Sequence, residues 1–512
     1  MKKLLTLLGT IVILGLSACG NSKEPYPYED LNENEEHYID EKHNENEARN
    51  AEQHQVQLPH RSPEPIPEQQ STVSLTLADF LYDFDYMMQA MEDSFPYFGM
   101  AERKLGVDIR ELGREARAII ENYPYSRQAF AYELGIALED MPEMDRHVFY
   151  SIIYCEFFRP LRGFGHNTIM NFMFFNPHAT PGSTAFEQNA RQTFSNPNVA
   201  EFYQEQASLF MNLAEYQPYL FHFYFPNMYL PTDSTTRFQP SPNTTGIIEE
   251  GRIAYINMPN FFVFNLRNYI WEFTSFYREI QNYDHLIIDI RENGGGNLEF
   301  ARLMVMYPLI RDRDNMPDLP LYSFFKDSEL GRFWGEAYIE LEINNLRSMP
   351  ETEYLLTIDD ILSTSTLPYL NQDDLQHLGY GVRFNVGLGA ITSDHVFRQT
   401  GRREMPHIPF HGQIWLLTSE RNASASALFA RQAKYTGFAT LVGGHTGGLY
   451  TMAPVAYRFL PNTGIIISWD HDYLTDRYGR ALNEFPTTPH YFNREDMDAL
   501  ETVLQMIAEE DH

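Results

Sequence analysis

The serines Ser424 and Ser426 follow a buried-looking apolar run in the stretch QIWLLTSERNASASALFARQAKY, which begins at residue 413. If QIWLLTS is a strand and ASALFARQAKY a helix, Ser424 lies at the first turn of that helix. Unpaired backbone N–H groups and the positive end of the helix dipole meet at this turn and stabilise a developing anion. A serine here is therefore either an N-cap or a nucleophile for acyl transfer.

A second loop with chemical potential is ENGGGN, whose three glycines (residues 294–296) follow the apolar run HLIIDIR. Glycine lets backbone N–H groups face a ligand without side-chain obstruction, and such amides can form an oxyanion hole. Turns also use glycine for conformational reasons alone. The coincidence of this loop with a serine-bearing helix start favours the catalytic interpretation.

The segments around these loops predict the architecture that positions them. Short, nearly continuous apolar runs are typical of strands buried on both faces, and they occur at GRIAYINMP, HLIIDIR, QIWLLTS, ATLVGG and GIIISW. The segment YIWEFTSFYREIQNY fits a crossover helix between the first two runs. Strands alternating with helices predict an α/β core over residues 246–512, with an insertion at about 311–409.

The region before this core divides into two parts. Apolar residues at three- and four-residue spacing predict a small helical domain over residues 74–170. Residues 171–245 are rich in aromatic residues and proline, show no clear peptide-binding PDZ module, and are interpreted as a linking or lid segment.

The N-terminus has the order of a signal peptide. Residues 1–19 combine Lys2 and Lys3, a short apolar stretch, and small residues before Cys19. LSAC resembles the lipobox of bacterial lipoproteins, which implies lipidation of Cys19 and a chain anchored to the extracytoplasmic face of the cell membrane; a cleaved secretory signal or an uncleaved anchor helix are the alternatives. Residues 20–73 are acidic and poor in apolar residues, which predicts a disordered tether.

The net charge of the chain limits the classes of partner that it can bind. The chain has 512 residues and a formal net charge of −32, with 38 Lys and Arg residues against 70 Asp and Glu residues. Nucleic-acid binding needs clustered cations, so the composition argues against a nucleic-acid partner. No motif calls for a metal, nucleotide or flavin cofactor.

The motifs, taken in order, resemble a known family. GRIAYINMP, YDHLIIDIRENGGGN, the SAS-plus-helix segment, LVGGHTGG and GRALNEFPTTPH occur in the order found in the carboxy-terminal processing, or tail-specific, and tricorn-type serine peptidases. The helices from residue 74 and the segment PLRGFGHNTI resemble the helical N-terminal domain of that family. The resemblance implies a core related to the ClpP/crotonase spiral of βαβ units.

The resemblance also assigns roles to residues. It implies that Ser424 is the nucleophile, that His166 is its general base, and that Glu484 orients or polarises the catalytic group. The oxyanion donors that it implies are the backbone amides of Gly294, Gly295 and Ala425.

The chain departs from the family pattern at informative positions. The tail-specific branch uses a Ser-Lys dyad, but Leu449 occupies the place of the lysine, and the nearest other lysine, Lys434, lies inside the predicted helix. Gly165 replaces the serine that precedes the tricorn histidine, and Gly163 or Phe164 stands at the usual aspartate. These differences indicate either a reduced Ser-His-Glu site or a degenerate one.

Other constellations compete with this assignment. His445, in GGHTGG, follows the nucleophile helix closely and is the rival of His166 as base. Ser323 and Lys326 match the Ser-x-x-Lys pattern of penicillin-binding enzymes, but the accompanying Lys-Thr-Gly is missing. An acidic cluster in DHDYLTD could hold a cation but is interpreted as a solvated hairpin turn. Its members are Asp470, His471, Asp472 and Asp476.

We therefore expect a membrane-tethered serine peptidase that cleaves peptides or proteins. The alternatives are a catalytically inactive, peptide-binding lipoprotein of the same fold, supported by the missing lysine and the altered histidine motif, and an esterase or other acyl hydrolase that uses the same serine. Cleavage specificity and oligomeric state do not follow from the sequence.

Overall fold

The computed structural model describes residues 75–176, 184–216, 218–225, 242–263, 266–313, 317–345, 355–358, 367–387, 391 and 393–510. The chain divides into two units after Val73, and the described residues all belong to the second unit. The predicted signal peptide, Cys19 and the tether lie outside the described residues. Among the helices that are described, none is long and apolar enough to cross a membrane.

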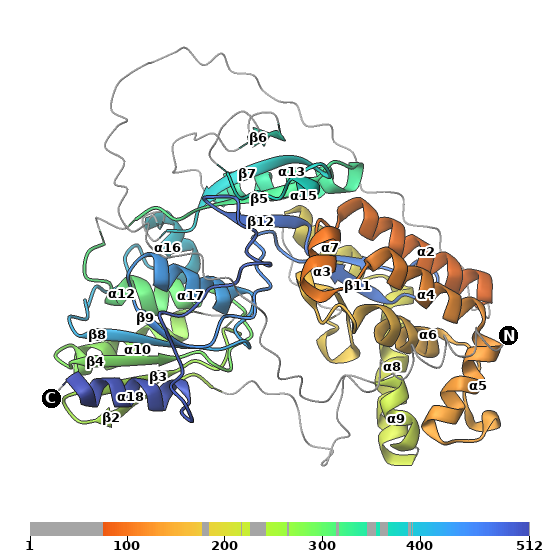
Figure 1. Ribbon diagram of the computed structural model, residues 1–512, viewed down its shortest axis with the longest axis horizontal. Coiled ribbons are helices and arrows are strands. Elements are labelled where there is room, and N and C mark those ends of the chain that lie inside the picture. Colours follow the sequence, from red (N-terminus) through yellow and green to blue (C-terminus); the bar gives the residue numbers. More distant parts are fainter. Residues whose placement is uncertain are drawn as a thin grey trace, which may run out of the picture. The chain divides into compact units, whose positions relative to one another are not determined.

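A mixed sheet forms the core of the C-terminal half (Figure 1). Neighbouring strands from β13 to β3 run parallel, and β2 pairs antiparallel with β3. The four predicted strands GRIAYINMP, HLIIDIR, QIWLLTS and ATLVGG correspond to β3, β4, β8 and β9, which confirms the α/β core. In spatial order the strands are β13 (Tyr491–Phe492), β9 (Thr440–Gly443), β8 (Gln413–Thr418), β4 (His285–Asp289), β3 (Ile253–Asn257) and β2 (Thr244–Glu249).

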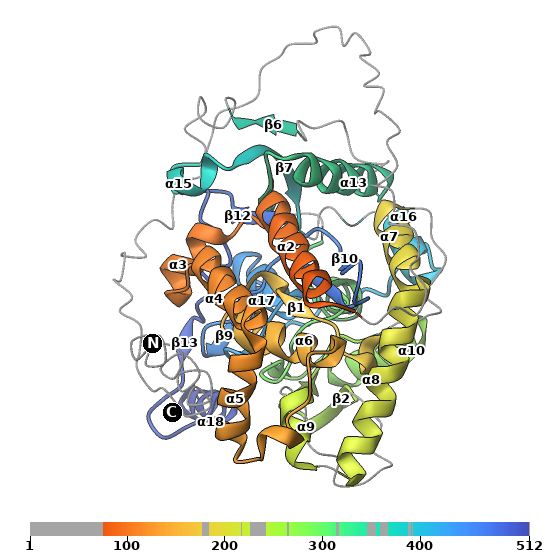
Figure 2. The same cartoon turned by 90° about the vertical axis from the view of Figure 1, so that its right-hand side faces the viewer.

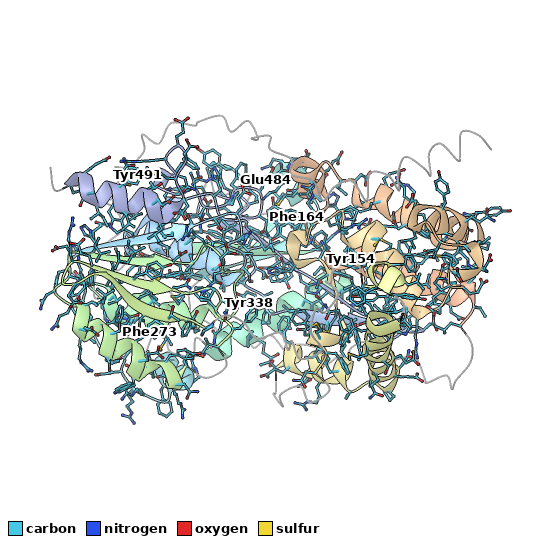
Figure 3. The ribbon with its side chains drawn as sticks, turned by 90° about the horizontal axis from the view of Figure 1, so that it is seen from below. Tyr154, Phe164, Phe273, Tyr338, Glu484 and Tyr491 are labelled. Atoms are coloured by element: carbon cyan, nitrogen blue, oxygen red, sulfur yellow. The ribbon has the colours of Figure 1, made fainter. Side chains whose placement is uncertain are left out.

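Helices cover both faces of this sheet, which explains the continuous apolar runs. The predicted crossover helix is α10 (Arg267–Ile280), and α17 (Ala425–Tyr435) connects β8 to β9. Phe273 of α10 and Phe429 of α17 pack with one set of strand residues, whereas Val503 of α18 (Ala499–Glu510) packs with the alternate set. Figure 3 shows Phe273 on the helix that covers one face of the sheet.

The predicted helical N-terminal domain is present. Its helices are α2 (Leu77–Ser94), α3 (Phe98–Leu105), α4 (Ile109–Glu121), α5 (Tyr123–Leu134) and α6 (Arg146–Ile153), which continues into a π-helical turn (Tyr154–Phe158). Local signals set the ends: the Asp108 carboxylate accepts hydrogen bonds from the first backbone amides of α4, and Gly106 ends α3 in the left-handed conformation.

The segment interpreted as a linker contains regular structure in its described part. Figure 2 shows α7 (Ala185–Phe194), α8 (Pro197–Tyr216) and α9 (Pro218–Tyr224). Phe202 and Tyr203 of α8 are buried, and a capping box between Thr184 and Glu187 starts α7. The aromatic residues that suggested a lid thus pack as helix core, which is a correction to the linker interpretation.

Two further sheets join early and late parts of the chain. One has the order β1 (Thr168–Ile169), β11 (Ile466–Trp469) and β10 (Ala456–Phe459); the other has the order β12 (Asp472–Asp476), β5 (Pro320–Lys326), β7 (Leu378–Asn385) and β6 (Leu355–Thr357). The run GIIISW is therefore a strand, but it lies outside the parallel sheet. The DHDYLTD stretch is not a solvated turn, because its residues from Asp472 to Asp476 form β12, which pairs with β5 and is buried at every residue.

The remaining described elements are short or lie in the predicted insertion. They are helical turns at Leu138–Asp140, Phe164–His166 and Phe172–Phe174, the turns Leu298–Phe300, Ala301–Met306 and Tyr307–Leu309, and the helices α13 (Glu329–Asn345), α15 (Gln372–Leu375) and α16 (Ser393–Thr400).

Candidate active site

Ser424 stands at the turn between β8 and α17 in a strained backbone conformation. Its φ of 55° and ψ of −126° lie in a region that non-glycine residues rarely adopt. The turn is held from outside, since the Ser424 amide donates to the Gly448 carbonyl at 3.0 Å. The Ser424 side chain makes no capping hydrogen bond to the helix. The N-cap alternative therefore does not account for the hydroxyl.

Ser426 has the opposite role. Its hydroxyl is fully buried, donates to the Asn293 carbonyl at 2.5 Å, and accepts from the Ala423 amide at 3.0 Å. Of the two serines, Ser426 fastens the turn to the glycine loop, and Ser424 is a partly exposed residue.

The glycine loop lies directly against this turn. A Cβ on Gly295 would stand 2.8 Å from the Ala423 carbonyl oxygen and 3.2 Å from the Ala425 amide nitrogen, and the φ of Gly295 is +110°. Only glycine satisfies both demands.

The predicted oxyanion donors differ in availability. The Gly295 amide donates to Asn293 Oδ1 at 2.8 Å, so it shapes the loop in this conformation. The amides of Gly294 and Ala425 donate no hydrogen bond to any described residue. Ala425 also begins α17, where the helix dipole favours a negative charge. Gly294 and Ala425 are thus the members of the predicted set that are open to an oxyanion.

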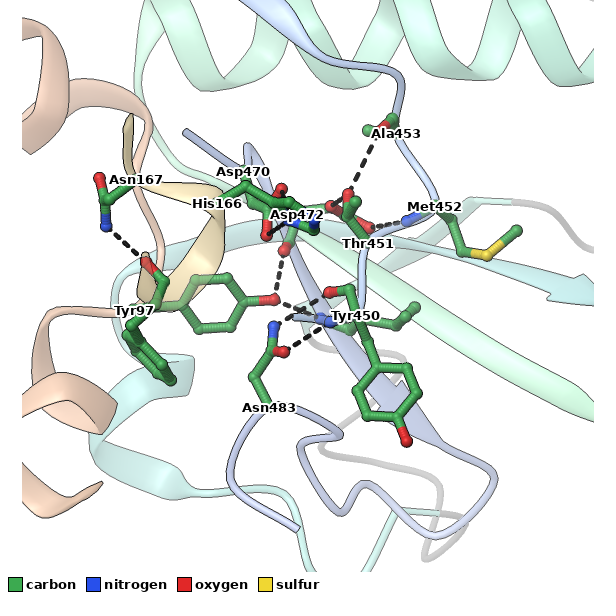
Figure 4. Close-up of polar contacts among 12 residues, drawn as sticks. Tyr97, His166, Asn167, Tyr450, Thr451, Met452, Ala453, Asp470, Asp472 and Asn483 are labelled. Atoms are coloured by element: carbon green, nitrogen blue, oxygen red, sulfur yellow. Dashed lines mark hydrogen bonds and ion pairs between the residues drawn. The ribbon is translucent and has the colours of Figure 1, made fainter. Parts of the chain in front are cut away.

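His166 ends a helical turn just before β1, with its backbone at φ 50°. Its Nδ1 lies 2.9 Å from both carboxylate oxygens of Asp470, and the Asp470 amide donates to the Gly165 carbonyl at 2.8 Å (Figure 4). The His166 side chain is 25% exposed and that of Asp470 is 4% exposed. With Nδ1–H donating to the carboxylate, Nε2 carries the lone pair that a general base needs.

The electrostatics of this pair suit proton transfer. Burial lowers the pKa of His166, but the charge of Asp470 and its hydrogen bond more than offset this, so the pKa lies above the ordinary 6.5. An imidazolium formed after proton abstraction is therefore stabilised where it forms.

Asp470 was missed as a functional residue by the sequence reasoning. It had been placed in a turn, whereas it follows β11, and the antiparallel pairing of Thr168 with Ser468 brings it beside His166. Two acidic residues directly after the apolar run GIIISW were the available signal. Their partner, 304 residues earlier, could not be inferred from spacing.

Glu484 does not contact His166 in the described structure. Its carboxylate binds Arg103 of α3 at 2.9 Å through both Nε and Nη2, and Arg103 also binds Asp374 at 2.7 Å. The neighbouring Asn483 exchanges two hydrogen bonds with the backbone of Tyr450. The GRALNE segment thus supports the chain segment that follows Gly448 beside Ser424, and the predicted catalytic role of Glu484 stays a prediction.

The rival residues lie in other surroundings. The His445 ring packs edge-on against the Phe492 ring, with 5.1 Å between the ring centroids, and burial lowers the pKa of His445. The Lys434 ammonium donates to the Thr488 carbonyl at 3.1 Å. The Ser323 hydroxyl donates to the Asp472 carboxylate, whereas the Lys326 ammonium lies over the Phe98 ring at 5.2 Å from its centroid, which sets aside the Ser-x-x-Lys pairing. The acidic cluster has no metal-ligand geometry in the described residues.

In the described residues no hydrogen bond joins the Ser424 hydroxyl to His166. Hydrogen bonds of this kind are often long in unliganded enzymes and tighten when substrate binds. The components of a serine hydrolase are therefore present. They are a serine at a strained strand-to-helix turn whose hydroxyl does not cap the helix, backbone amides beside it that donate no hydrogen bond to any described residue, and a histidine–carboxylate pair.

Comparison with known families gives the same class. Residues 252–316 and 357–491 match the model of peptidase family S41. The match, to a family of serine-type peptidases, spans less than half of the chain. It includes Ser424, the glycine loop, Asp470 and Glu484, while His166 lies before the matched residues. No curated protein matches the chain.

Several solved structures are similar to the chain at low identity. A lipoprotein from Streptococcus agalactiae is 11% identical with a TM-score of 0.40, covering 87% of this chain and 99% of its own. Mature CPAF is 12% identical with a TM-score of 0.42, and the match covers 85% of this chain and 95% of the CPAF chain. The photosystem II D1 C-terminal processing protease is 16% identical with a TM-score of 0.29, covering 53% of each chain.

Proposed function

We propose that this chain is a lipid-anchored, extracytoplasmic serine peptidase that uses a Ser424–His166–Asp470 triad. The observation that carries the proposal is Ser424 itself: its backbone is strained, its hydroxyl does not cap the helix, and it adjoins open backbone amides. Strain of this kind persists where the surrounding structure enforces it, commonly at functional sites.

The reaction follows from the roles of these groups. Ser424 Oγ attacks the scissile carbonyl carbon while its proton passes to His166 Nε2, and the carbonyl oxygen becomes an oxyanion held by the Gly294 and Ala425 amides. Collapse of this intermediate breaks the C–N bond, and the leaving amine takes the proton from His166. Water then attacks the acyl-enzyme with His166 again as base, releasing the acid and restoring Ser424.

The location rests on the first residues of the chain. The Lys2-Lys3 start, the short apolar stretch and the small residues before Cys19 support a lipoprotein signal, with residues 20–73 as a tether between the lipid and the peptidase. An acidic tether is repelled by anionic headgroups and would keep the catalytic unit away from the bilayer.

The test uses the full chain in bacterial membranes, treated with a fluorophosphonate probe and mapped by mass spectrometry. Attack by Ser424 on phosphorus displaces fluoride, so we expect a label on Ser424 that is absent from Ser424→Ala and strongly reduced in His166→Ala. In the same preparation, Cys19→Ala should move the labelled chain to the soluble fraction.

The possible outcomes separate the alternatives. A folded wild-type chain that takes no label would replace the peptidase with the inactive binding lipoprotein. A labelled chain that hydrolyses esters but no member of a peptide panel would be an acyl hydrolase instead.

A further inference from the structure

A second buried carboxylate, Asp472, lies two residues after Asp470 and is fully shielded from solvent. It accepts hydrogen bonds from the Thr451 hydroxyl at 2.5 Å, the Met452 amide at 3.0 Å and the Ser323 hydroxyl at 2.9 Å. Figure 4 shows the first two contacts beside the His166–Asp470 pair. Among the described residues no lysine or arginine forms an ion pair with this carboxylate.

These contacts connect the two halves of the catalytic site. The Ser424 amide is bonded to the Gly448 carbonyl, and Thr451 and Met452 follow in the same segment. That segment is bonded to Asp472, which the backbone links to Asp470 and thereby to His166. The path runs from the nucleophile to the base through one side chain.

The other surroundings of Asp472 are rigid. The Tyr97 hydroxyl donates to the Asp472 carbonyl at 2.6 Å and accepts from the Leu474 amide at 3.2 Å, which ties the start of β12 to the helical domain. Because β12 pairs with β5 along its whole length, the carboxylate has little freedom to move.

We propose that Asp472 is a positioning residue of this site, which holds the Gly448–Met452 segment beside Ser424 in fixed register with the His166–Asp470 pair. The inference rests on the proposed function. It adds a residue that touches neither substrate nor the reacting atoms but sets the separation between nucleophile and base.

The negative charge of Asp472 gives the proposal an independent signature. Burial, followed by the charge of Asp470, raises the pKa of Asp472 to about 6, and the ionised group in turn helps to raise the pKa of His166. The ionisable side chains around the Asp472 carboxylate are those of Asp470, His166 and Tyr97. His471, which lies between the two aspartates in the sequence, stacks on Trp334, and the Lys104 ammonium lies over the Phe164 ring. The remaining contacts, from β5 and the Gly448–Met452 segment, are hydroxyls and an amide.

The experiment measures the rate of fluorophosphonate labelling of Ser424 against pH in the full chain. Thr451→Val removes the side-chain bond of the link, leaves the bond from the Met452 amide, and keeps the Asp472 charge, so we expect at least a tenfold slower reaction with an unchanged acid midpoint. Thr451→Ser restores the hydroxyl and should recover most of the rate. Asp472→Asn removes the charge with little change of shape, so the acid midpoint should move to lower pH.

The matched control is Thr446→Val, the same change five residues earlier, at a hydroxyl bonded to the Tyr450 hydroxyl at 2.9 Å and not to Asp472. Its rate should stay within about threefold of wild type, with thermal unfolding confirming that each variant is folded. If Asp472→Asn does not fold, the Thr451 pair decides the question.

Two results would overturn the inference in different ways. A wild-type chain that labels, with Thr451→Val equally fast or Thr451→Ser no better than valine, refutes the positioning role and leaves the peptidase proposal intact. A folded wild-type chain that does not label refutes the proposed function and this inference with it.

Discussion

At the scale of single residues, backbone strain is found at both proposed catalytic residues. Five described non-glycine residues have positive φ, and three of them are Ser424, His166 and Leu449. Leu449 follows Gly448, the carbonyl that holds the Ser424 amide. Left-handed backbone at a leucine costs of the order of 1 kcal/mol or more, so this strain must be offset by the packing around it.

The same scale separates Asp470 from Glu484 as the partner of His166. Asp470→Asn removes the carboxylate that orients the ring and stabilises the imidazolium, so the rate of Ser424 labelling should fall by about 1,000-fold or more. Glu484→Gln weakens a partly exposed ion pair with Arg103, whose other partner Asp374 remains, so the rate should change by less than about tenfold.

Labelling rates of the two variants, measured from pH 5 to 9, check this prediction. Wild-type labelling should rise with pH to a midpoint above 6.5, because only neutral His166 is a base. A larger loss in Glu484→Gln than in Asp470→Asn would return the catalytic role to Glu484.

At the scale of elements, the sheet brings the serine turn and the glycine loop together. β4 and β8 are parallel neighbours with Asp289 opposite Leu417, so the loops that leave their C-terminal ends lie side by side. Ligands of open α/β sheets bind at this edge. The Asn422 side chain, fully buried and bonded to the Ile290 carbonyl, joins the two loops.

Gly295 and Gly294 offer a matched test of this contact. A methyl group on Gly295 meets backbone atoms of residues 423 and 425, whereas one on Gly294 meets nothing within 4 Å. We expect Gly295→Ala to lower the free energy of unfolding by about 1–3 kcal/mol and to abolish labelling. Gly294→Ala should change stability by less than about 1 kcal/mol.

Urea unfolding and probe labelling of both variants test whether the glycine loop presses on the serine turn. Neither substitution removes a backbone amide, so both variants keep the proposed oxyanion donors. Equal behaviour of the two variants would mean that the loop does not press on the serine turn as the structure describes.

At the scale of the whole molecule, a partly buried acid makes stability depend on pH. Glu156 lies in the π-helical turn after α6, where burial raises its pKa to about 7 against the opposing effect of Arg159. The folded state holds this proton more tightly than the unfolded state. The stabilisation that Glu156 gives the folded state is therefore fully present below about pH 4.5 and is lost as the pH rises through 7.

Glu156→Gln should remove this dependence, so the variant gains up to about 3 kcal/mol relative to wild type between pH 4.5 and 8. Denaturant unfolding at several pH values measures the difference, in which the other titrating groups cancel. The exposed Glu102→Gln controls for the loss of one negative charge. A difference between Glu156→Gln and wild type that stays constant with pH would contradict the raised pKa of Glu156.

Local patterns in the sequence were sufficient to predict the strand-helix alternation, the helical domain, and the positions of Ser424 and the glycine loop. Each of these depends on hydrophobic periodicity or turn chemistry within a few residues. The helices in residues 184–224 were missed because their aromatic residues gave a weaker periodic signal than the proline-rich surroundings.

Tertiary structure alone decided which carboxylate faces His166. Asp470 meets it because β1 pairs with β11 in one register, and DHDYLTD is buried because β12 pairs with β5 of the insertion. Pairings across about 150 to 300 residues depend on which distant surfaces exclude water together, and spacing along the chain does not record that. The sequence determined the proposed nucleophile and its turn, whereas the fold selected the partner of the proposed base.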